Sequence, residues 1–185
     1  MEICVFPGTF NPIHNAHLKM AEYALDKYNF DKIIFIPSYI PPHKNINPQL
    51  AEHRYKMVEL AISDNPKFEI SDIEYNCEGK SYSIITVKKI IEQYNLKTRL
   101  NFIIGTDAFE KIDTWCQAEE LKELVHFIVF PRGKNNIENI TEGWDYELTD
   151  MEYINISSTE IREGINLQIG NKVEEYIKNN GLYKI

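Results

Sequence analysis

Short apolar runs alternate with amphipathic segments along this chain, and no other feature of the sequence constrains the fold as strongly. Runs rich in β-branched and aromatic residues are typical of strands that are buried on both faces of a sheet. The strongest strand candidates are Ile3–Phe6, Ile33–Ile36, Phe102–Ile104 and Phe127–Phe130, and the weaker ones are Phe68–Ile73 and Tyr153–Ile156. Apolar residues at helical spacing predict helices over His17–Tyr28, Gln49–Ile62, Ser83–Tyr94 and Asn171–Asn180.

Strands that alternate with helices favour a parallel sheet with right-handed crossovers. We therefore expect an α/β fold, a Rossmann-like doubly wound parallel sheet, and, at 185 residues, a single domain over 1–185. Composition predicts loops over Ile40–Pro48 and Lys134–Trp144. Asn15 is the expected N-cap of the first helix, and Gly181 is expected to stop the last one.

The charge balance excludes some classes of partner. Lys and Arg number 20 against 28 Asp and Glu, which gives a formal net charge of −8. Because basic residues supply most non-specific affinity for nucleic acid, we expect no nucleic-acid partner.

No segment approaches the ~20 apolar residues of a membrane span, and the N-terminus does not resemble a signal peptide. Three cysteines without a CxxC pair (Cys4, Cys77 and Cys116) favour reduced thiols, so we expect a cytoplasmic protein.

The segment Pro7–His17, between the first expected strand and helix, carries the clearest chemical signal. It lies where open parallel sheets bind ligands, and Gly8 would let the backbone approach a ligand or adopt a positive φ. His14 and His17 are three residues apart near a helix N-terminus, which favours anions. Two imidazoles there suit a phosphate group and can meet developing charge. The alternatives are two surface histidines, or half of a metal site for which no third ligand is evident.

A second phosphate-binding pattern lies near the other end of the chain, in Ile156–Arg162. Ser157 and Glu160 have the spacing of a capping box, which predicts that a helix begins there. Hydroxyl groups, free N–H groups and the guanidinium of Arg162 together suit the β- and γ-phosphates of a nucleotide. The alternative is a capped helix with a surface arginine.

The strings PGTFNPIHNAH and ISSTEIR resemble the two signatures of the nucleotidylyltransferase superfamily, GTFxPxHxGH and ISSTxIR. Members of this superfamily join a nucleotide monophosphate to a phosphate-bearing substrate. Both histidines are kept, whereas Pro7, Asn11 and Ala16 replace a glycine, an aspartate and a glycine of the commonest form. Further segments resemble bacterial nicotinate-nucleotide adenylyltransferases, namely Pro41–Lys44 (PPHK), Gly79–Ser83, Gly105–Asp107 (a GxD turn) and Gly181–Tyr183.

The resemblance to this family assigns further residues. It implies that Gly105 and Asp107 lie near ribose hydroxyls, that Arg132 lies along the adenine, and that Thr86 lies by the pyridine carboxylate. It also implies that Trp115 stacks on the nicotinate ring, since an indole face suits an electron-poor pyridinium. Without the family, Trp115 and Thr86 would be read as packing residues, and Asp107 as a helix cap.

The resemblance implies transfer of AMP from ATP to nicotinate mononucleotide, which gives nicotinate adenine dinucleotide and pyrophosphate. Mg²⁺ would be carried with ATP, and no metal-ligating side chains are expected. The implied catalytic residues are His14, His17, Lys44 and Arg162. The implied ATP-binding residues are Gly8, Thr9, Phe10, His14, His17, Gly105, Asp107, Arg132, Ser157, Ser158, Thr159 and Arg162. The implied nicotinate mononucleotide-binding residues are Asn11, His43, Lys44, Thr86 and Trp115.

Other functions remain open from the sequence. One is an adenylyltransferase that acts on nicotinamide mononucleotide or phosphopantetheine, and another is a nucleotide-binding sensor without catalysis. A tRNA-handling protein with a related HxxH turn is disfavoured by the acidic charge. The expected partners are two small-molecule substrates, and a homo-oligomer is compatible with the sequence.

Overall fold

The computed structural model of the chain describes residues 1–133, 137 and 142–185. Its centre is a six-stranded sheet in which every paired strand runs parallel to its neighbour, in the order β3-β2-β1-β4-β5-β6. The strands are β1 (Ile3–Gly8), β2 (Lys32–Pro37), β3 (Phe68–Ile70), β4 (Leu100–Gly105), β5 (Val125–Phe130) and β6 (Tyr146–Leu148). The expected Rossmann-like fold is therefore confirmed.

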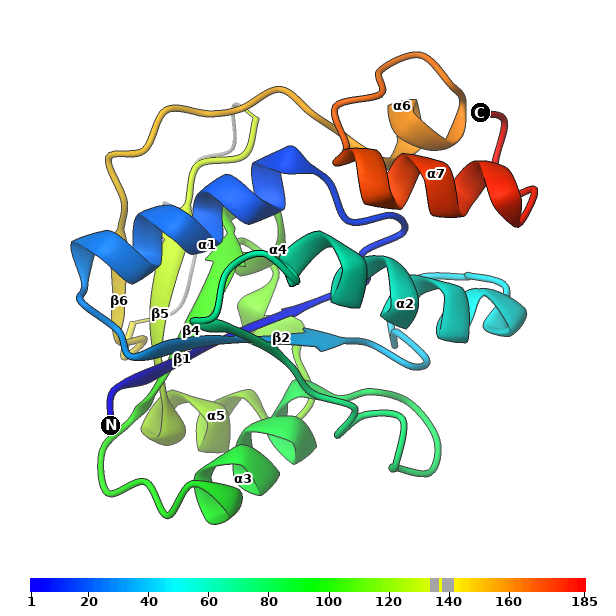
Figure 1. Cartoon of the computed structure of the whole chain (residues 1–185). Helices are drawn as coiled ribbons and strands as arrows, with labels where there is room; N and C mark the ends of the chain where they lie inside the picture. The colour runs from blue at the N-terminus through cyan, green and yellow to red at the C-terminus, as the bar shows by residue number, and fades with distance from the viewer. Residues whose placement is uncertain (134–136, 138–141) are drawn as a thin grey trace.

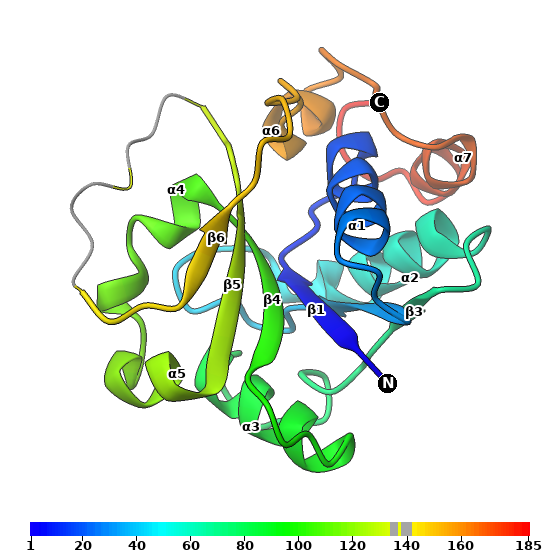
Figure 2. The same ribbon diagram turned by 90° about the vertical axis from the view of Figure 1, so that its left-hand side faces the viewer.

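Helices cover both faces of the sheet. The α-helices are α1 (Asn15–Lys27), α2 (Ala51–Ile62), α3 (Ser83–Gln93), α4 (Thr106–Phe109), α5 (Ala118–Leu124), α6 (Ser158–Arg162) and α7 (Asn171–Asn179). There are also two short 3₁₀ turns. The first, η1 (Pro48–Leu50), directly precedes α2, and the second, η2 (Ile112–Thr114), lies between α4 and α5. Figure 1 shows α1, α2 and α7 on one side of the sheet and α3 and α5 on the other. Figure 2 shows the strands fanning out between these two layers.

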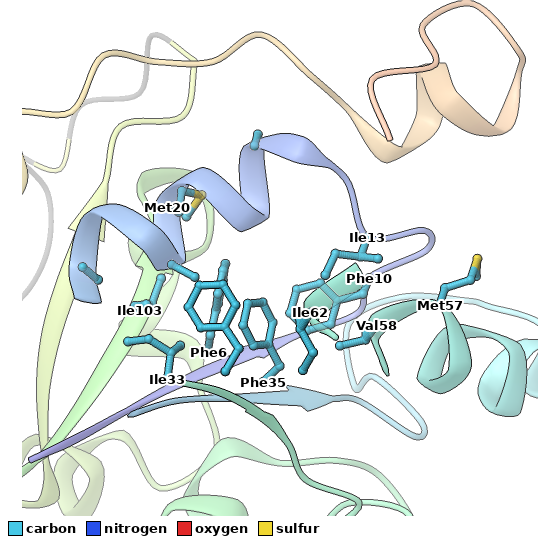
Figure 3. Close-up of a cluster of buried hydrophobic side chains, with 14 of the residues drawn as sticks. Phe6, Phe10, Ile13, Met20, Ile33, Phe35, Met57, Val58, Ile62 and Ile103 are labelled. Atoms are coloured by element: carbon cyan, nitrogen blue, oxygen red, sulfur yellow. The ribbon is translucent and has the colours of Figure 1, made fainter. Parts of the chain in front are cut away.

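Alternating residues of the central strands belong to two separate cores, because successive side chains on a strand point to opposite faces of the sheet. On β1, Cys4 and Phe6 join the core under α1 and α2, whereas Ile3 and Val5 join the core over α3 and α5. Figure 3 shows the first core, where Phe35 of β2 lies between the sheet and the helices. Both faces of the central strands are therefore buried, which explains their continuous apolar runs.

Several sequence expectations need correction. Tyr153–Ile156 is not a strand: Tyr153 is 44% exposed, and the edge of the sheet is formed instead by β6, which pairs with β5. The exposed, short β6 has too little apolar character to be predicted. Likewise α4, η2 and α5 are too short to show helical periodicity. The predicted loop Lys134–Trp144 lies partly outside the described residues.

Helix ends also differ in detail from the expectations. The N-cap of α1 is His14, and Asn15 is the first helical residue, so the prediction for Asn15 was wrong. The prediction for Gly181 is confirmed, because α7 ends at Asn179 and Gly181 adopts a left-handed φ of 60°. Among the described residues, none of the helices combines the length and the apolar character that crossing a membrane requires.

The strand order creates a natural site for ligands. The chain leaves β1 toward β2 and β3 on one side, and then crosses to β4 on the other side of β1. The loops that follow β1 and β4 therefore run in opposite directions, and open α/β sheets bind ligands at such a point.

The aromatic core tests this packing. Phe35 is fully buried, and its ring lies 5.4 Å from Phe6, 5.9 Å from Phe10 and 5.3 Å from Phe68, measured between ring centroids. Phe35→Ala should lower the free energy of unfolding by about 3–5 kcal/mol, because it removes these contacts and leaves a cavity. Urea denaturation measures this change. The control Leu148→Ala, at a side chain that is 49% exposed, should change the free energy by about 0.5 kcal/mol or less.

Candidate active site

A large cavity, with a volume of about 900 Å³, opens at the carboxyl ends of β1 and β4. Fifteen of the seventeen residues expected to bind substrate line it, and they are Gly8, Thr9, Phe10, Asn11, His17, His43, Lys44, Gly105, Asp107, Trp115, Arg132, Ser157, Ser158, Thr159 and Arg162. His14 lines a second cavity of about 20 Å³ behind it, together with His17 and Arg132. Thr86 lines neither of these two cavities.

The turn after β1 is fixed by aromatic packing. Gly8 keeps strand geometry, so it does not supply a positive φ; a Cβ there would lie only 2.7 Å from the Phe10 ring. Phe10 itself adopts a positive φ of 48°, and its ring lies edge-on to Phe6 at 5.5 Å and to His17 at 5.1 Å. A glycine is therefore needed at position 8 to make room for a ring that holds His17 in place.

The two histidines form a stacked pair at the start of α1. Their ring centroids are 3.7 Å apart. Nδ1 of His17 accepts a hydrogen bond from the backbone N–H of His14 at 3.2 Å, so a neutral His17 carries its proton on Nε2. Both ring nitrogens of His14 are buried and have no hydrogen-bond partner within the described parts of the chain.

Both imidazoles are neutral at pH 7. Burial lowers the pKa of His14 to about 3, and the positive charge of Arg132 contributes to this shift. Burial also lowers the pKa of His17 well below its usual value, and His14 and Arg132 lower it further. An anion bound beside the pair would offset the nearby positive charge. It could also accept hydrogen bonds from the N–H groups of the neutral imidazoles.

Asn11 connects the first turn to the far end of the chain. Its side-chain oxygen accepts a hydrogen bond from the Tyr183 hydroxyl at 2.6 Å, and its backbone oxygen accepts one from Arg162 at 2.7 Å. The Ser158 hydroxyl bonds the backbone oxygen of Pro12 at 2.9 Å. These bonds bring the two predicted phosphate-binding motifs, 146 residues or more apart, into one site.

The start of α6 is capped as predicted. The Ser157 hydroxyl accepts a hydrogen bond from the Glu160 N–H at 3.1 Å. The guanidinium of Arg162 also reaches the Thr159 hydroxyl at 3.1 Å. Arg162 is therefore held at the cavity wall by its own helix as well as by the turn after β1.

Positive charge gathers at the mouth of the cavity. Loss of hydration lowers the pKa of Lys44, and the neighbouring charges of Arg132 and Arg162 lower it as well. Nε of Arg132 lies 3.9 Å from a carboxylate oxygen of Asp107. A Cβ at Gly105 would lie 2.7 Å from Asp107 and 2.8 Å from Arg132, so glycine lets these two side chains meet over the end of β4. This cluster can neutralise a polyanion.

The two tryptophans have different environments. Trp144 is a core residue that is 8% exposed and donates a hydrogen bond to Asp113 at 2.8 Å. Trp115 is half-buried at the end of η2, lines the cavity, and lies 6.2 Å from Phe102 between ring centroids. Of the two, Trp115 lines the cavity and Trp144 does not.

Two buried ionisable residues, Arg54 and Glu74, were not predicted from the sequence. Arg54 of α2 is fully buried and donates hydrogen bonds to the backbone oxygens of Thr9 and Tyr39, at 2.7 and 3.0 Å. Glu74 lines the cavity, is 4% exposed, and accepts a hydrogen bond from the Thr86 hydroxyl at 2.7 Å. Burial raises the pKa of Glu74 to about 7. In the sequence, both residues look like ordinary solvated charges.

The described residues contain no group of three or more His, Cys, Asp or Glu side chains that could hold a metal ion. Asp107 stands as a single carboxylate next to Arg132 at the mouth of the cavity. A divalent cation that enters on a nucleotide would keep phosphate oxygens and water as most of its ligands, as Mg²⁺ prefers.

Comparisons with known proteins show which family this chain resembles. A sequence model of the family described as cytidylyltransferase-like matches residues 5–164. A relative from Caldicellulosiruptor saccharolyticus, named "probable nicotinate-nucleotide adenylyltransferase", is 41% identical, and the match covers 100% of both chains. The nicotinate-nucleotide adenylyltransferase of Bacillus subtilis is 37% identical, and the match covers 99% of this chain and 98% of the relative.

Among solved structures, the nicotinic acid mononucleotide adenylyltransferase of Plasmodium falciparum, in complex with NaAD, has a similar fold. It superposes with a TM-score of 0.81 at 22% identity, over 98% of this chain and 97% of its own. The fold and the full-length sequence similarity lead to one assignment: the chain belongs to the cytidylyltransferase-like family and, within it, to the nicotinate-nucleotide adenylyltransferases.

Proposed function

We propose that this protein transfers AMP from ATP to nicotinate mononucleotide, releasing pyrophosphate and forming nicotinate adenine dinucleotide. The observation that carries the proposal is one cavity that combines a neutral histidine pair, a cationic mouth and a tryptophan wall. Such a cavity suits two small phosphate-bearing molecules, one of which carries an aromatic ring. The relatives of this chain bear the name of the same reaction.

The chemistry needs neither a dedicated base nor a covalent intermediate. The 5′-phosphate of nicotinate mononucleotide is largely ionised at neutral pH, because its second pKa is about 6. One of its oxygens attacks the α-phosphorus of ATP in line, a new P–O bond forms, and the bond to the β-phosphate oxygen breaks. The electron pair leaves with pyrophosphate. Catalysis then rests on positioning and on stabilising charge.

His17 would donate Nε2–H to an oxygen of the α-phosphate, where negative charge is held during the transfer. His14 would support it from the smaller cavity. Lys44 would neutralise phosphate charge from the loop after β2. Because the imidazoles are neutral before substrate binds, they do not repel the cations beside them.

ATP would occupy the side of the cavity formed by the turn after β1, the end of β4 and α6. Arg162 and Thr159 would hold the leaving pyrophosphate, with Ser157 and Ser158 shaping that wall. Asp107 lines the cavity and would accept hydrogen bonds from ribose hydroxyls. The remaining proposed contacts are those of Gly8, Thr9 and Phe10 with the phosphates, and those of Gly105 and Arg132 with adenosine.

Nicotinate mononucleotide would occupy the side formed by the loop after β2 and by Trp115. Asn11, His43 and Lys44 line this side and would meet the phosphate and ribose. Trp115 would stack on the pyridine ring. Thr86 would act indirectly, because its hydroxyl bonds Glu74 and Glu74 lines the cavity.

We further propose that Mg²⁺ enters bound to ATP and that both substrates are small molecules, with no nucleic-acid partner. The chain would act as a single domain, and the reaction would take place in the cytoplasm. The free thiols of Cys4, Cys77 and Cys116 support the location. The position of the cations inside one cavity, in a chain of net charge −8, supports small anions over a polymer.

The test supplies ATP and Mg²⁺ with one acceptor at a time and measures pyrophosphate. Nicotinate mononucleotide should give the highest kcat/KM. A higher value with nicotinamide mononucleotide or phosphopantetheine would assign the rival substrate. Tight ATP binding without pyrophosphate from any acceptor would instead support a sensor.

His17→Ala should lower kcat about 10²–10³-fold, because it removes a hydrogen-bond donor to charge in the transition state. Steady-state kinetics at saturating substrates measures this change. The matched control is His53→Ala, because His53 bonds Tyr176 at 2.9 Å outside the cavity. Near-normal turnover in His17→Ala, at a rate similar to that of the control, would remove the role assigned to His17.

Trp115→Ala should raise the KM for nicotinate mononucleotide about tenfold, with a smaller effect on the KM for ATP. Stacking of a base on an aromatic ring contributes about 1–3 kcal/mol, which corresponds to this change or more. Separate KM measurements for the two substrates check the prediction. Equal effects on both would indicate that Trp115 supports the cavity wall only.

A further inference from the structure

One buried arginine joins two of the loops that line the cavity. Arg54 lies on α2 and is fully buried. Its Nη1 donates a hydrogen bond to the backbone oxygen of Thr9 at 2.7 Å, and its Nη2 donates one to the backbone oxygen of Tyr39 at 3.0 Å. Thr9 belongs to the turn after β1, and Tyr39 belongs to the loop after β2. A single guanidinium therefore spans both segments.

These two hydrogen bonds begin where the pairing of the strands stops. The register of β1 and β2 ends at Gly8 and Pro37, and the Ser38 N–H then donates to the Gly8 backbone oxygen at 2.9 Å. From Thr9 and Tyr39 onward the two backbones lead into different loops. A guanidinium is suited to hold two backbone oxygens at a fixed spacing, because it is planar and its N–H donors form a rigid fork.

Both of the segments held in this way lead to residues of the site. Thr9 is followed by Phe10, whose φ is 48° and whose ring lies 5.1 Å from that of His17. Tyr39 comes shortly before His43 and Lys44, which line the cavity. A shift of either backbone oxygen would therefore change where the turn after β1 lies relative to the loop after β2.

Ser81 holds the start of the same loop from another direction. Its hydroxyl oxygen accepts hydrogen bonds from the N–H groups of Tyr39 and Ile40, at 3.1 and 3.2 Å. Its own N–H donates to the backbone oxygen of Ile40 at 2.8 Å. The backbone of Tyr39 is thus fixed at both of its polar groups, the N–H by Ser81 and the oxygen by Arg54.

The charge of Arg54 also reaches the site. Arg54 lines neither cavity, so it does not contact a ligand bound there. Burial lowers the pKa of Lys44, and Arg54 is one of the cations that lower this pKa further. A test of the two hydrogen bonds must therefore keep the positive charge in place.

We propose that Arg54 is a positioning residue that sets the relative placement of the turn after β1 and of residues 39–44, and so aligns the phosphates of the two substrates. This inference rests on the proposed function, because it assigns ATP to the first segment and nicotinate mononucleotide to the second. Arg54 acts through the backbone oxygens of Thr9 and Tyr39.

The first test is Arg54→Lys, which keeps the charge and replaces the planar fork by a single nitrogen. The kcat should fall about 10–100-fold, because misplacement of reacting groups by about 1 Å can have an effect of this size. Both KM values should change much less, since each substrate mainly contacts one of the two segments. Steady-state kinetics at a temperature below the Tm of the variant measures this difference.

Two further variants separate the hydrogen bonds from the charge and from a general effect of substitution. Arg54→Met removes the fork and the charge, so its kcat should be no higher than that of Arg54→Lys, and its KM values should be raised further. The matched control is Arg99→Lys, because Arg99 pairs with Asp145 at 2.9 Å outside the cavity. This control should keep the wild-type kcat.

Chemical rescue gives an independent readout. Arg54→Ala leaves space for a free guanidinium ion, which at millimolar concentration should restore part of kcat, whereas methylammonium of the same charge should not. If the variants of Arg54 do not fold, Ser81→Ala frees the N–H groups of Tyr39 and Ile40 and should lower kcat more than either KM.

Several outcomes would overturn the positioning role. They are a wild-type kcat in folded Arg54→Lys with only the Tm lowered, equal rescue of Arg54→Ala by both cations, and a wild-type kcat in Ser81→Ala where the variants of Arg54 do not fold. Absence of wild-type activity on nicotinate mononucleotide would instead overturn the proposed function, so the two failures are distinguishable.

Discussion

Parallel pairing is the constraint on which the rest of this structure depends. Because every strand runs in the same direction, all of the loops that follow the strands emerge at one edge of the sheet. The apolar strands can then be buried on both faces under helices, and polar residues are left to this edge. Since β1 has neighbours on both sides, the crossing from β3 to β4 separates the loops there and leaves room for a ligand.

The electrostatics of the site depend on distance and burial more than on total charge. The chain carries a net charge of −8, yet Lys44, Arg132 and Arg162 are close enough to influence one another at one cavity mouth. The histidines beside them stay neutral because they are buried, and because Arg132 lowers the pKa of both imidazoles and Lys44 lowers that of His17. An acidic exterior and a cationic cavity together favour a small polyanion over a long one.

The sequence predicts the buried strands and the long helices well. Burial of a strand on both faces leaves a continuous apolar run, and packing of a helix on one face leaves apolar residues at helical spacing. It misses β6 and α5, since a three-residue exposed edge strand and a seven-residue helix carry little such signal. In the site, fifteen of the residues expected from the sequence motifs line the cavity. Arg54 and Glu74 are missed because a buried charge is recognisable only from its three-dimensional partners. Asn15 is misplaced because His14, an unusual cap, takes the position expected for it.

The hydrogen bond between Tyr183 and Asn11 joins residues that are 172 positions apart in the chain, so the ribosome adds one long before the other. Domains tend to fold as units, with N-terminal parts appearing first. Here the sheet and both histidines are made before α6 and α7, so the turn after β1 gains its Arg162 and Tyr183 contacts only after these two helices have emerged. A growing chain would thus hold much of the sheet before it holds a finished pocket, because the turn after β1 needs residues as late as Arg162 and Tyr183.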